Sequence, residues 1–588
     1  MLPPEIQRIV LLIALAATGY FMILAWNDDM QQAKQAVPVS EAPLSSNGSL
    51  PSSGVTPGSS PAPRSVEIAE LPVAPSAPPA SADVPDSSMV VGTTVQTQPS
   101  QTPGLHEPSN LVSVATPTLK VWIDRVGGDI VRVQLPKFPV ELGMPDEPYM
   151  LLDNSPLATY IAQSGLIGPD GPDASGARPL YEASVSQLTV GPGEERELVL
   201  TTTHNGADIR KTFRFRGDEY LFDVEYELFN NTSQTKQAAL FAQIKRDSKP
   251  PASQDTFALA PRPYLGAAFT TPEERYLKVD FEDIDDDGPL DETLSGGWVA
   301  FLQHYFLSAW IAPDEQTNRY SARKSADGTY IFGYTGQLQQ VEPGSMGAWA
   351  TQFYAGPKDQ KRLEQIAENL NLTVDYGFLW WVAVPLFYLL DWLYGLVGNW
   401  GVAIILLTVV VKAVLYPLSA AGYKSMANMR RVAPAMKRLQ ERYSTDREKL
   451  SKEMMALYKR EGANPLGGCL PMLLPMPIFI ALYWVLFESV ELRQAPFFLW
   501  IHDLAVMDPY FILPLLMGAS MYWMQTLNPQ VGDPMQVKMM KMMPIMFTVL
   551  FLFFPAGLVL YWLVNNVLSI AQQQYVYRRA EKAQAASS

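Results

Sequence analysis

The feature that most constrains this chain is a set of apolar stretches long enough to cross a lipid bilayer. Residues 400–418, WGVAIILLTVVVKAVLYPL, contain a single charged residue, Lys412. A helix of this length spans the hydrocarbon core, where a lysine costs roughly 2.5–3.5 kcal/mol even on lenient insertion scales. The pattern predicts a membrane-embedded helical protein in which Lys412 has a specific role.

Further apolar stretches predict six transmembrane helices in all. An anchor at 9–26 is followed by acidic residues and lacks a convincing cleavage site, which favours an uncleaved helix over a signal peptide. The last apolar region is too long for one span and contains the turn signal Pro555-Ala556-Gly557, so we divide it into two helices. Besides 400–419, the predicted spans are 9–26, 466–487, 509–527, 537–553 and 557–574.

The stretch 376–398 is ambiguous, because it is apolar enough to span but contains Pro385 and Asp391. The next span begins at Trp400, and two crossings would need a very tight turn at Gly398-Asn399. We therefore prefer an aromatic-rich helix that lies in the membrane interface.

Charge is unevenly distributed along the chain. From Val374 onward 18 Lys and Arg face 13 Asp and Glu, whereas the first 373 residues hold 26 against 46. The loop 420–465 is strongly basic and the loop 488–508 is acidic. The excess of positive charge on cytoplasmic loops predicts that 420–465 and both termini are cytoplasmic, with the large region before 358 outside.

The region between the anchor and the later spans has two parts. Residues 30–117 are rich in Pro, Ser, Ala and Val with few aromatics, which predicts a disordered tether. Residues 118–357 read as many short strands, with hairpins expected at Gly127-Gly128 and Gly217-Asp218, and so predict a β-sandwich.

Several kinds of site are excluded or disfavoured by composition. Cys469 is the only cysteine and the four histidines are scattered, so we expect no disulfide, metal site or cofactor. No carboxylate pair, Ser-His-Asp set or phosphate loop stands out, so an enzyme is the least favoured reading. The acidic half makes nucleic-acid binding improbable.

The basic loop 420–465 has apolar residues at helical spacing and a capping signal at Thr445–Glu448, which predict a helical hairpin. It is either a solvated hairpin that only obeys the charge rule or a docking arm for a partner or for anionic lipid. If it is a docking arm, we expect these residues to make the contacts: Arg430, Arg431, Lys437 and Arg438.

Two readings of Lys412 remain open. It lies roughly 18 Å along its helix from Trp400, and its side chain could snorkel to the inner interface. Alternatively, it faces a wet cavity in the bundle and receives an anionic visitor. We expect such a cavity to be lined by polar residues of this and other spans: Thr408, Gln525, Asn565 and Asn566.

The chain resembles the YidC/Oxa family of membrane protein insertases in its Gram-negative form. The segments that carry the resemblance are GNWGVAIILLTVVVKAVLYPLS, EMMALYKREGANPLGGCLPMLLPMPIFIALYWVLFESVELRQAPFFLWIHDL, DPYFILPLLMG, FFPAGLVLYWLVNN and, in the outer region, GGWVAFLQHYFLSAWI. The resemblance implies an α-helical polytopic protein of the inner membrane with a periplasmic all-β supersandwich domain. The expected divisions are an anchor at 1–29, the tether at 30–117, the β domain at 118–357, connecting and interfacial helices at 358–399, the core at 400–575 and a cytoplasmic tail at 576–588.

The resemblance also implies a mechanism. A hydrophilic groove, open to the cytoplasm and to lipid, attracts the polar segment of a client through one positive residue. That residue is usually Arg in this family and is Lys412 here, and a lysine, unlike an arginine, is able to lose its proton. A second departure is Pro475, where relatives carry Gln. The hydrophobic slide of the family maps onto Met472, Met476, Phe479, Phe547 and Phe551.

The partners implied by the resemblance are nascent membrane proteins, the Sec translocon with its accessory subunits, the ribosome and signal recognition pathway, and anionic lipids. Two other functions compete with insertion: a transporter with an anion site at Lys412, and an assembly scaffold whose outer domain binds glycans. The absence of a visible internal repeat disfavours the transporter.

Overall fold

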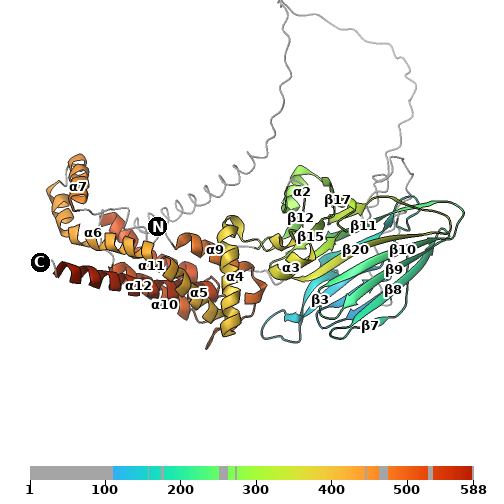
Figure 1. Ribbon diagram of the computed structural model, residues 1–588, viewed down its shortest axis with the longest axis horizontal. Helices are drawn as coiled ribbons and strands as arrows, with labels where there is room; N and C mark the ends of the chain where they lie inside the picture. The colour runs from blue at the N-terminus through green and yellow to red at the C-terminus, as the bar shows by residue number, and fades with distance from the viewer. Residues whose placement is uncertain are drawn as a thin grey trace, which may run out of the picture. The chain divides into compact units, whose positions relative to one another are not determined.

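The computed structural model describes residues 110–585, apart from 157, 174–177, 251–262, 272–273, 444–445, 462–474 and 528–533. The predicted anchor at 9–26 and the tether up to residue 109 lie outside the described residues. The strands and helices belong to one structural unit of the chain, Ala77–Ser588. Strands dominate up to Pro357 and helices dominate after it (Figure 1).

The described strands form two large sheets. The eleven-stranded sheet has the order β14-β17-β18-β11-β5-β4-β3-β2-β1-β7, with β19 paired to β11. Its strands are β1 Leu111–Ala115, β2 Lys120–Asp124, β3 Asp129–Pro139, β4 Pro148–Ser155, β5 Ala158–Ile167, β7 Gln187–Thr189, β11 Lys236–Arg246, β14 Leu290–Ser295, β17 Thr317–Lys324, β18 Tyr330–Gly336 and β19 Gln339–Val341.

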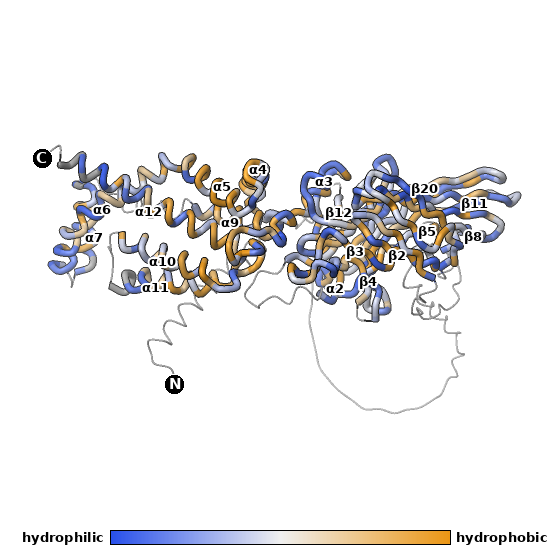
Figure 2. Tube along the Cα trace, turned by 90° about the horizontal axis from the view of Figure 1, so that it is seen from below, coloured by the Kyte–Doolittle hydropathy of each residue, from blue (hydrophilic) through white to orange (hydrophobic). Residues whose placement is uncertain are grey.

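The nine-stranded sheet has the order β13-β12-β15-β16-β20-β10-β9-β8-β6. Its strands are β6 Glu182–Ala183, β8 Glu195–His204, β9 Ala207–Arg216, β10 Leu221–Asn230, β12 Gly266–Phe269, β13 Leu277–Val279, β15 Trp298–Leu302, β16 Phe306–Ile311 and β20 Met346–Pro357. Figure 2 shows hydrophobic residues on β2 and β5 of the eleven-stranded sheet.

Both predicted hairpins are confirmed. Gly127 and Gly128 have φ angles of 75° and 64°, which favour glycine, and they join β2 to β3 in an antiparallel pair. The Gly217-Asp218 turn joins β9 to β10. Alternate residues of β10 are buried, as expected when one face of a strand packs on a core.

Two details of the β prediction were wrong. The tether was predicted to run to 117, but β1 begins at Leu111 and pairs with β2. Its short sequence, LVSVA, lies within the Ser- and Val-containing composition that we attributed to the tether. The domain is also not wholly β, because the helix α2 at Phe281–Asp287 lies within it and begins with a capping box at Asp280.

Helices make up the rest of the described chain. After the strands come α3 Gln360–Ile366, the short 3₁₀ turns η4 Leu370–Thr373 and η5 Gly377–Leu379, α4 Trp380–Val397, α5 Trp400–Val414, α6 Tyr416–Arg442, α7 Arg447–Glu461, α9 Met476–Glu488, η7 Val490–Leu492, α10 Ile512–Leu527, α11 Pro534–Phe551 and α12 Ala556–Ala585. The predicted hairpin at 420–465 is confirmed as α6 and α7, and the predicted break at 555–557 is confirmed between α11 and α12.

A tight turn joins α4 to α5. Gly398 ends α4 in the left-handed region, with φ at 65°, and the Asn399 side chain caps α5 by accepting a hydrogen bond from the Val402 N–H at 3.0 Å. Figures 1 and 2 both show α4 running across the direction of α12. The turn that we judged too tight for two crossings therefore exists, but α4 does not run antiparallel to the other helices.

Length and apolarity single out two membrane-span candidates among the described residues. The first is Gly377–Val397, and the second is α5 with α6, if the 68° bend between them is counted within one span. The bend follows from Pro417, which lacks the N–H that would continue the helix. The helix α9 is also apolar but shorter than these two candidates. The count of six spans stays a prediction.

Polar contacts join the end of α9 to the β-rich part. The Lys358 ammonium lies 2.6 Å from a Glu488 carboxylate oxygen, and both side chains are buried. The backbone oxygen of Phe487 accepts a hydrogen bond from His304 at 2.8 Å, and Arg493 donates to the carbonyl of Pro139 at 2.6 Å. The loop after α9 is therefore fixed to the strands through buried polar groups.

Candidate functional site

The helix α5 places Lys412 on its inward face. Lys412 is 5% exposed and Thr408, one turn before it, is 1% exposed, whereas Val409, Val410 and Val414 are exposed. Residues four apart share one side of a helix, so this spacing directs Lys412 and Thr408 into the bundle. The side chain is directed toward α12 and does not extend to the surface of the protein, as snorkelling would require.

The partner of Lys412 is a hydroxyl. The ammonium donates a hydrogen bond to Oγ of Ser569 on α12 at 2.7 Å. Ser569 in turn donates to the carbonyl of Asn565 at 2.7 Å. Within the described part of the chain, Lys412 forms no ion pair, so its positive charge is not neutralised by a neighbouring carboxylate.

Lys412 also lies in the last turn of α5, where the helix carries a partial negative charge from its terminal carbonyls. A cation there is stabilised by about 0.3–1 kcal/mol. This contribution and the Ser569 hydroxyl together offset part of the cost of burying the ammonium. Lysine has three N–H donors, and the contact with Ser569 uses one of them.

The hydroxyl that receives Lys412 belongs to a polar stripe on α12. Asn566, Ser569, Gln573 and Tyr577 lie three or four residues apart and are each at most 7% exposed. The Asn566 amide donates to Oγ of Ser520 on α10 at 2.9 Å, and Gln573 donates to the hydroxyl of Tyr577 at 2.9 Å. The stripe is thus a line of buried polar groups between α5, α6 and α10.

The predicted cavity residues have different outcomes. Asn566 belongs to the stripe, whereas Thr408 donates its hydroxyl to the carbonyl of Ile404 in its own helix at 2.7 Å. Gln525 donates to the backbone oxygen of Met540 on α11. Asn565 contributes its backbone oxygen to Ser569. No described contact joins Gln525 to Lys412.

Three of the predicted slide residues gather in one aromatic cluster. The Phe479 ring of α9 lies 4.4 Å from the Trp562 ring of α12, and Phe551 of α11 lies 5.4 Å from the same ring. Phe547 is 6.3 Å from Trp562. Phe551 is only 2% exposed, so it packs in the interior and offers no open surface. Met476 is 39% exposed on α9, and Met472 lies outside the described residues.

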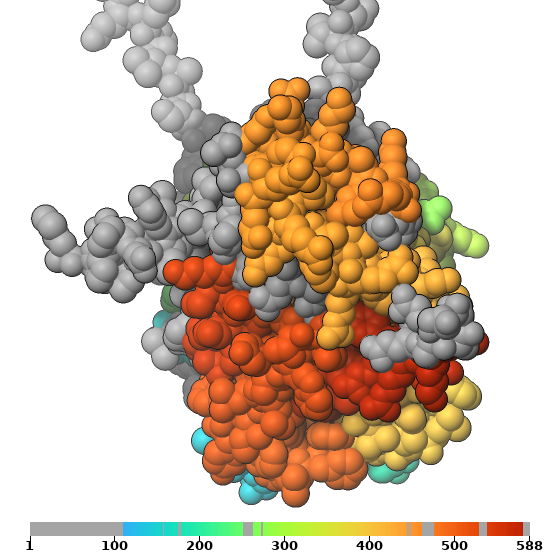
Figure 3. Space-filling view, turned by 90° about the vertical axis from the view of Figure 1, so that its left-hand side faces the viewer, coloured from blue at the N-terminus to red at the C-terminus, as the bar shows by residue number. Residues whose placement is uncertain are grey.

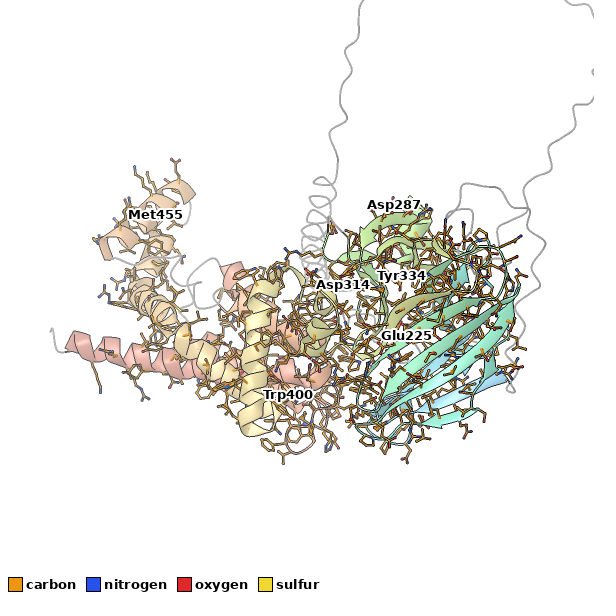
Figure 4. The ribbon with its side chains drawn as sticks, turned by 45° about the vertical axis from the view of Figure 1, so that its right-hand side comes forward. Glu225, Asp287, Asp314, Tyr334, Trp400 and Met455 are labelled. Atoms are coloured by element: carbon orange, nitrogen blue, oxygen red, sulfur yellow. The ribbon has the colours of Figure 1, made fainter. Side chains whose placement is uncertain are left out.

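The hairpin α6–α7 carries the predicted docking residues on its surface. Its two helices pack through a small apolar cluster that contains Met429, Val432, Met436 and Leu457. Figure 3 shows the hairpin (orange) on the face turned to the viewer, and Figure 4 places Met455 of α7 and Trp400 at opposite ends of the helical part. All four predicted docking residues are exposed: Arg430, Arg431, Lys437 and Arg438.

The arrangement suits the binding of a polar or anionic segment. Among the described residues, no group of three or more His, Cys, Asp or Glu side chains could hold a metal ion. The site combines a buried cation without a carboxylate partner, a line of neutral polar groups and an adjoining aromatic cluster. These features favour the binding of a polypeptide segment that is partly anionic or polar and partly apolar.

Comparison with known proteins decides the family. Residues 111–389 match the family model described as YidC periplasmic domain, and residues 392–583 match the model described as 60Kd inner membrane protein. The chain is 48% identical over 582 residues to the membrane protein insertase YidC of Azotobacter vinelandii, covering 98% of this chain and 99% of that protein. This chain belongs to the YidC family. The YidC of Pseudomonas putida strain GB-1 is 47% identical over 581 residues, with the same coverage.

Membership of the YidC family confirms the resemblance seen in the sequence, and it is a family of membrane insertases, not of enzymes. The β-rich domain followed by C-terminal helices is the architecture that the two family models divide between them. A solved structure titled active YidC insertase with the first transmembrane domain resolved is 19% identical, covers 79% of this chain and 92% of its own, and has a TM-score of 0.35.

Sequence reasoning missed Ser569, Ser520 and Gln573 in this YidC-family chain. Serine is common in membrane helices, so a single one attracts no attention. The signal was the spacing of polar residues at 566, 569 and 573, which places them on one helical face.

Proposed function

We propose that this chain inserts, folds and helps assemble integral proteins of the bacterial inner membrane, alone or beside the Sec translocon. The observation that carries the proposal is the burial of Lys412 on the inward face of α5 with a neutral hydroxyl as its partner. A buried cation of this kind is available to a visiting anion. A permanent structural role would be better served by a carboxylate partner.

The proposed topology has six spans, with both termini in the cytoplasm and the β domain in the periplasm as a supersandwich. The 68° bend after α5 and the basic residues of α6–α7 are consistent with a cytoplasmic hairpin that leaves the membrane at Pro417. The course of α4 across α12 and its exposed Trp380, Trp381 and Trp392 support a position in the outer interface. The opposing possibility is that α4 crosses the bilayer, which its length permits.

In the proposed mechanism, Lys412 and the stripe on α12 receive the polar part of a client that must cross the membrane. At an effective dielectric constant of 20, two opposite charges about 4 Å apart attract by about 4 kcal/mol. This attraction helps to offset the desolvation of the client's carboxylates. The apolar part of the client contacts Met476 and the exposed surface of α9 and α11, and then passes into lipid.

The hairpin α6–α7 is proposed as the arm that meets partners on the cytoplasmic side. Its exposed cations suit ribosomal RNA, the signal recognition pathway or anionic lipid headgroups, because each presents phosphates. The apolar cluster at its base keeps the two helices together. The surface is therefore a basic arm made of two packed helices.

The experiment uses vesicles that contain this protein as their only protein. A radiolabelled client with one transmembrane segment and a short translocated tail is synthesised in their presence, and protease protection of the tail measures insertion. We expect protection well above that in empty vesicles. Flux of chloride or organic anions without client protection would favour the transporter and contradict the proposal.

A further inference from the structure

We infer that Ser569 is a positioning residue for Lys412, holding the ammonium against α12 where the polar segment of a client arrives. The inference rests on the proposed function and names a residue that acts through Lys412. Its basis is the contact between Nζ of Lys412 and Oγ of Ser569 at 2.7 Å, with both residues 5% exposed.

The hydrogen bonds of Ser569 fix the direction of its hydroxyl. A serine hydroxyl has one donor and two acceptor positions. The donor is directed to the carbonyl of Asn565, four residues earlier on α12. The oxygen lone pairs are therefore turned away from that carbonyl, and one of them accepts from Lys412. A hydroxyl in this state attracts a cation without cancelling its charge.

Lysine needs such a partner more than arginine does. Both side chains carry about 2 kcal/mol of rotamer entropy, but the guanidinium is a pre-organised planar fork, whereas the ammonium is a compact charge on a flexible stem. Without a fixed acceptor, no hydrogen bond would select the Lys412 rotamer that directs the ammonium at α12. Ser569 limits this freedom, because its own hydroxyl is held by the Asn565 carbonyl and its oxygen accepts from the ammonium.

A neutral partner also leaves Lys412 ready for a client. A carboxylate of the client binds an ammonium more strongly than a hydroxyl does, since both partners are then charged. The hydroxyl is thus a weak acceptor that keeps the charge in place and does not compete with an acidic segment. An aspartate at 569 would remove the free positive charge.

The test is a double-mutant cycle on reconstituted full-length protein, with an acidic-tailed client and a neutral-tailed client. We expect Ser569→Ala to lower insertion of the acidic-tailed client by about ten- to a hundredfold, as loss of a hydrogen bond to a charged group predicts. Ser569→Thr keeps the hydroxyl and should restore insertion. In a Lys412→Ala background, Ser569→Ala should have no further effect.

The matched control is Thr548→Val. Thr548 on α11 also donates its hydroxyl four residues back, to Pro544, but no described contact joins it to Lys412. Insertion of the neutral-tailed client by each variant shows that the protein is folded. The inference is overturned if Ser569→Ala matches Thr548→Val, if Thr fails to restore insertion, or if both clients lose insertion equally. If Lys412→Ala itself inserts acidic-tailed clients normally, the proposed role of Lys412 fails as well.

Discussion

The buried ion pair between Lys358 and Glu488 makes a strong prediction about the junction of the β domain and the helices. Lys358 follows β20 and Glu488 ends α9, so the pair joins elements that are far apart in the sequence. The two side chains are 5% and 6% exposed, and their charged atoms are 2.6 Å apart. The perturbation is Lys358→Met, which keeps the length of the side chain and removes its charge.

The expected cost follows from this burial. Removing one partner of a buried pair leaves an uncompensated charge and typically costs about 3–5 kcal/mol. The control is Lys361→Met, because Lys361 pairs with Asp391 at 2.5 Å but is 54% exposed. An exposed pair contributes less than about 1 kcal/mol. Adding Glu488→Gln to Lys358→Met removes the stranded charge and should recover most of the loss.

Hydrogen exchange of the purified protein in detergent measures the effect where it occurs. Peptides that cover 485–494 should exchange about a hundred- to several-thousandfold faster in Lys358→Met than in wild type, since each 1.4 kcal/mol of local opening free energy is a factor of ten. Lys361→Met should change these peptides by fewer than fivefold. Equal exchange in the two variants, or no recovery in the double variant, would refute the reasoning.

Three further predictions concern other parts of the chain. Burial, with Lys358 and Arg493 nearby, lowers the pKa of His304 to about 3. Below pH 6.5 the imidazole of His304 therefore binds a proton in the unfolded chain but stays neutral in the folded protein. Stability should therefore be full above pH 6.5 and fall by up to about 2–3 kcal/mol as the pH drops to about 4.5; His304→Gln should flatten this slope in denaturant titrations, and an unchanged slope would exclude the histidine. A Cβ at Gly401 would overlap the Phe497 ring. Gly401→Ala should therefore lower the unfolding midpoint by an amount equivalent to about 1–3 kcal/mol. A midpoint equal to wild type would show that the loop with Phe497 moves aside without cost. Reversing the hairpin charges to Glu should cut client insertion at least severalfold without changing the melting temperature. The changed residues are Arg430, Arg431, Lys437 and Arg438. Normal insertion by this variant would leave them only a role in setting the topology.

Local signals in the sequence were sufficient for the elements that they encode. Paired glycines at 127–128 specified a hairpin because only glycine adopts their positive φ angles readily. Pro555 and Gly557 marked the break before α12, and the spacing of apolar residues in 426–457 marked the hairpin. In each case a few adjacent residues carry the whole physical reason.

Contacts between distant residues could not be predicted in this way. Lys358 and Glu488 lie 130 residues apart, and nothing near either of them indicates the other. Lys412 was found because a charge in an apolar helix is conspicuous, whereas Ser569, 157 residues later, is an ordinary residue until the fold brings it to the ammonium. The start of β1 was missed because its pairing with β2 outweighs the composition of its surroundings.

The most direct measurement of the central claim compares Lys412→Arg, Lys412→Ala and Lys412→Glu in vesicles that contain only this protein. Clients with acidic and neutral tails are scored by protease protection. If Lys412 attracts the polar segment of a client, Arg should retain insertion, Ala should fail mainly with acidic tails, and Glu should be worse because it repels them. Neutral-tailed clients should change least. Equal insertion of both clients by the Ala and Glu variants would contradict the account.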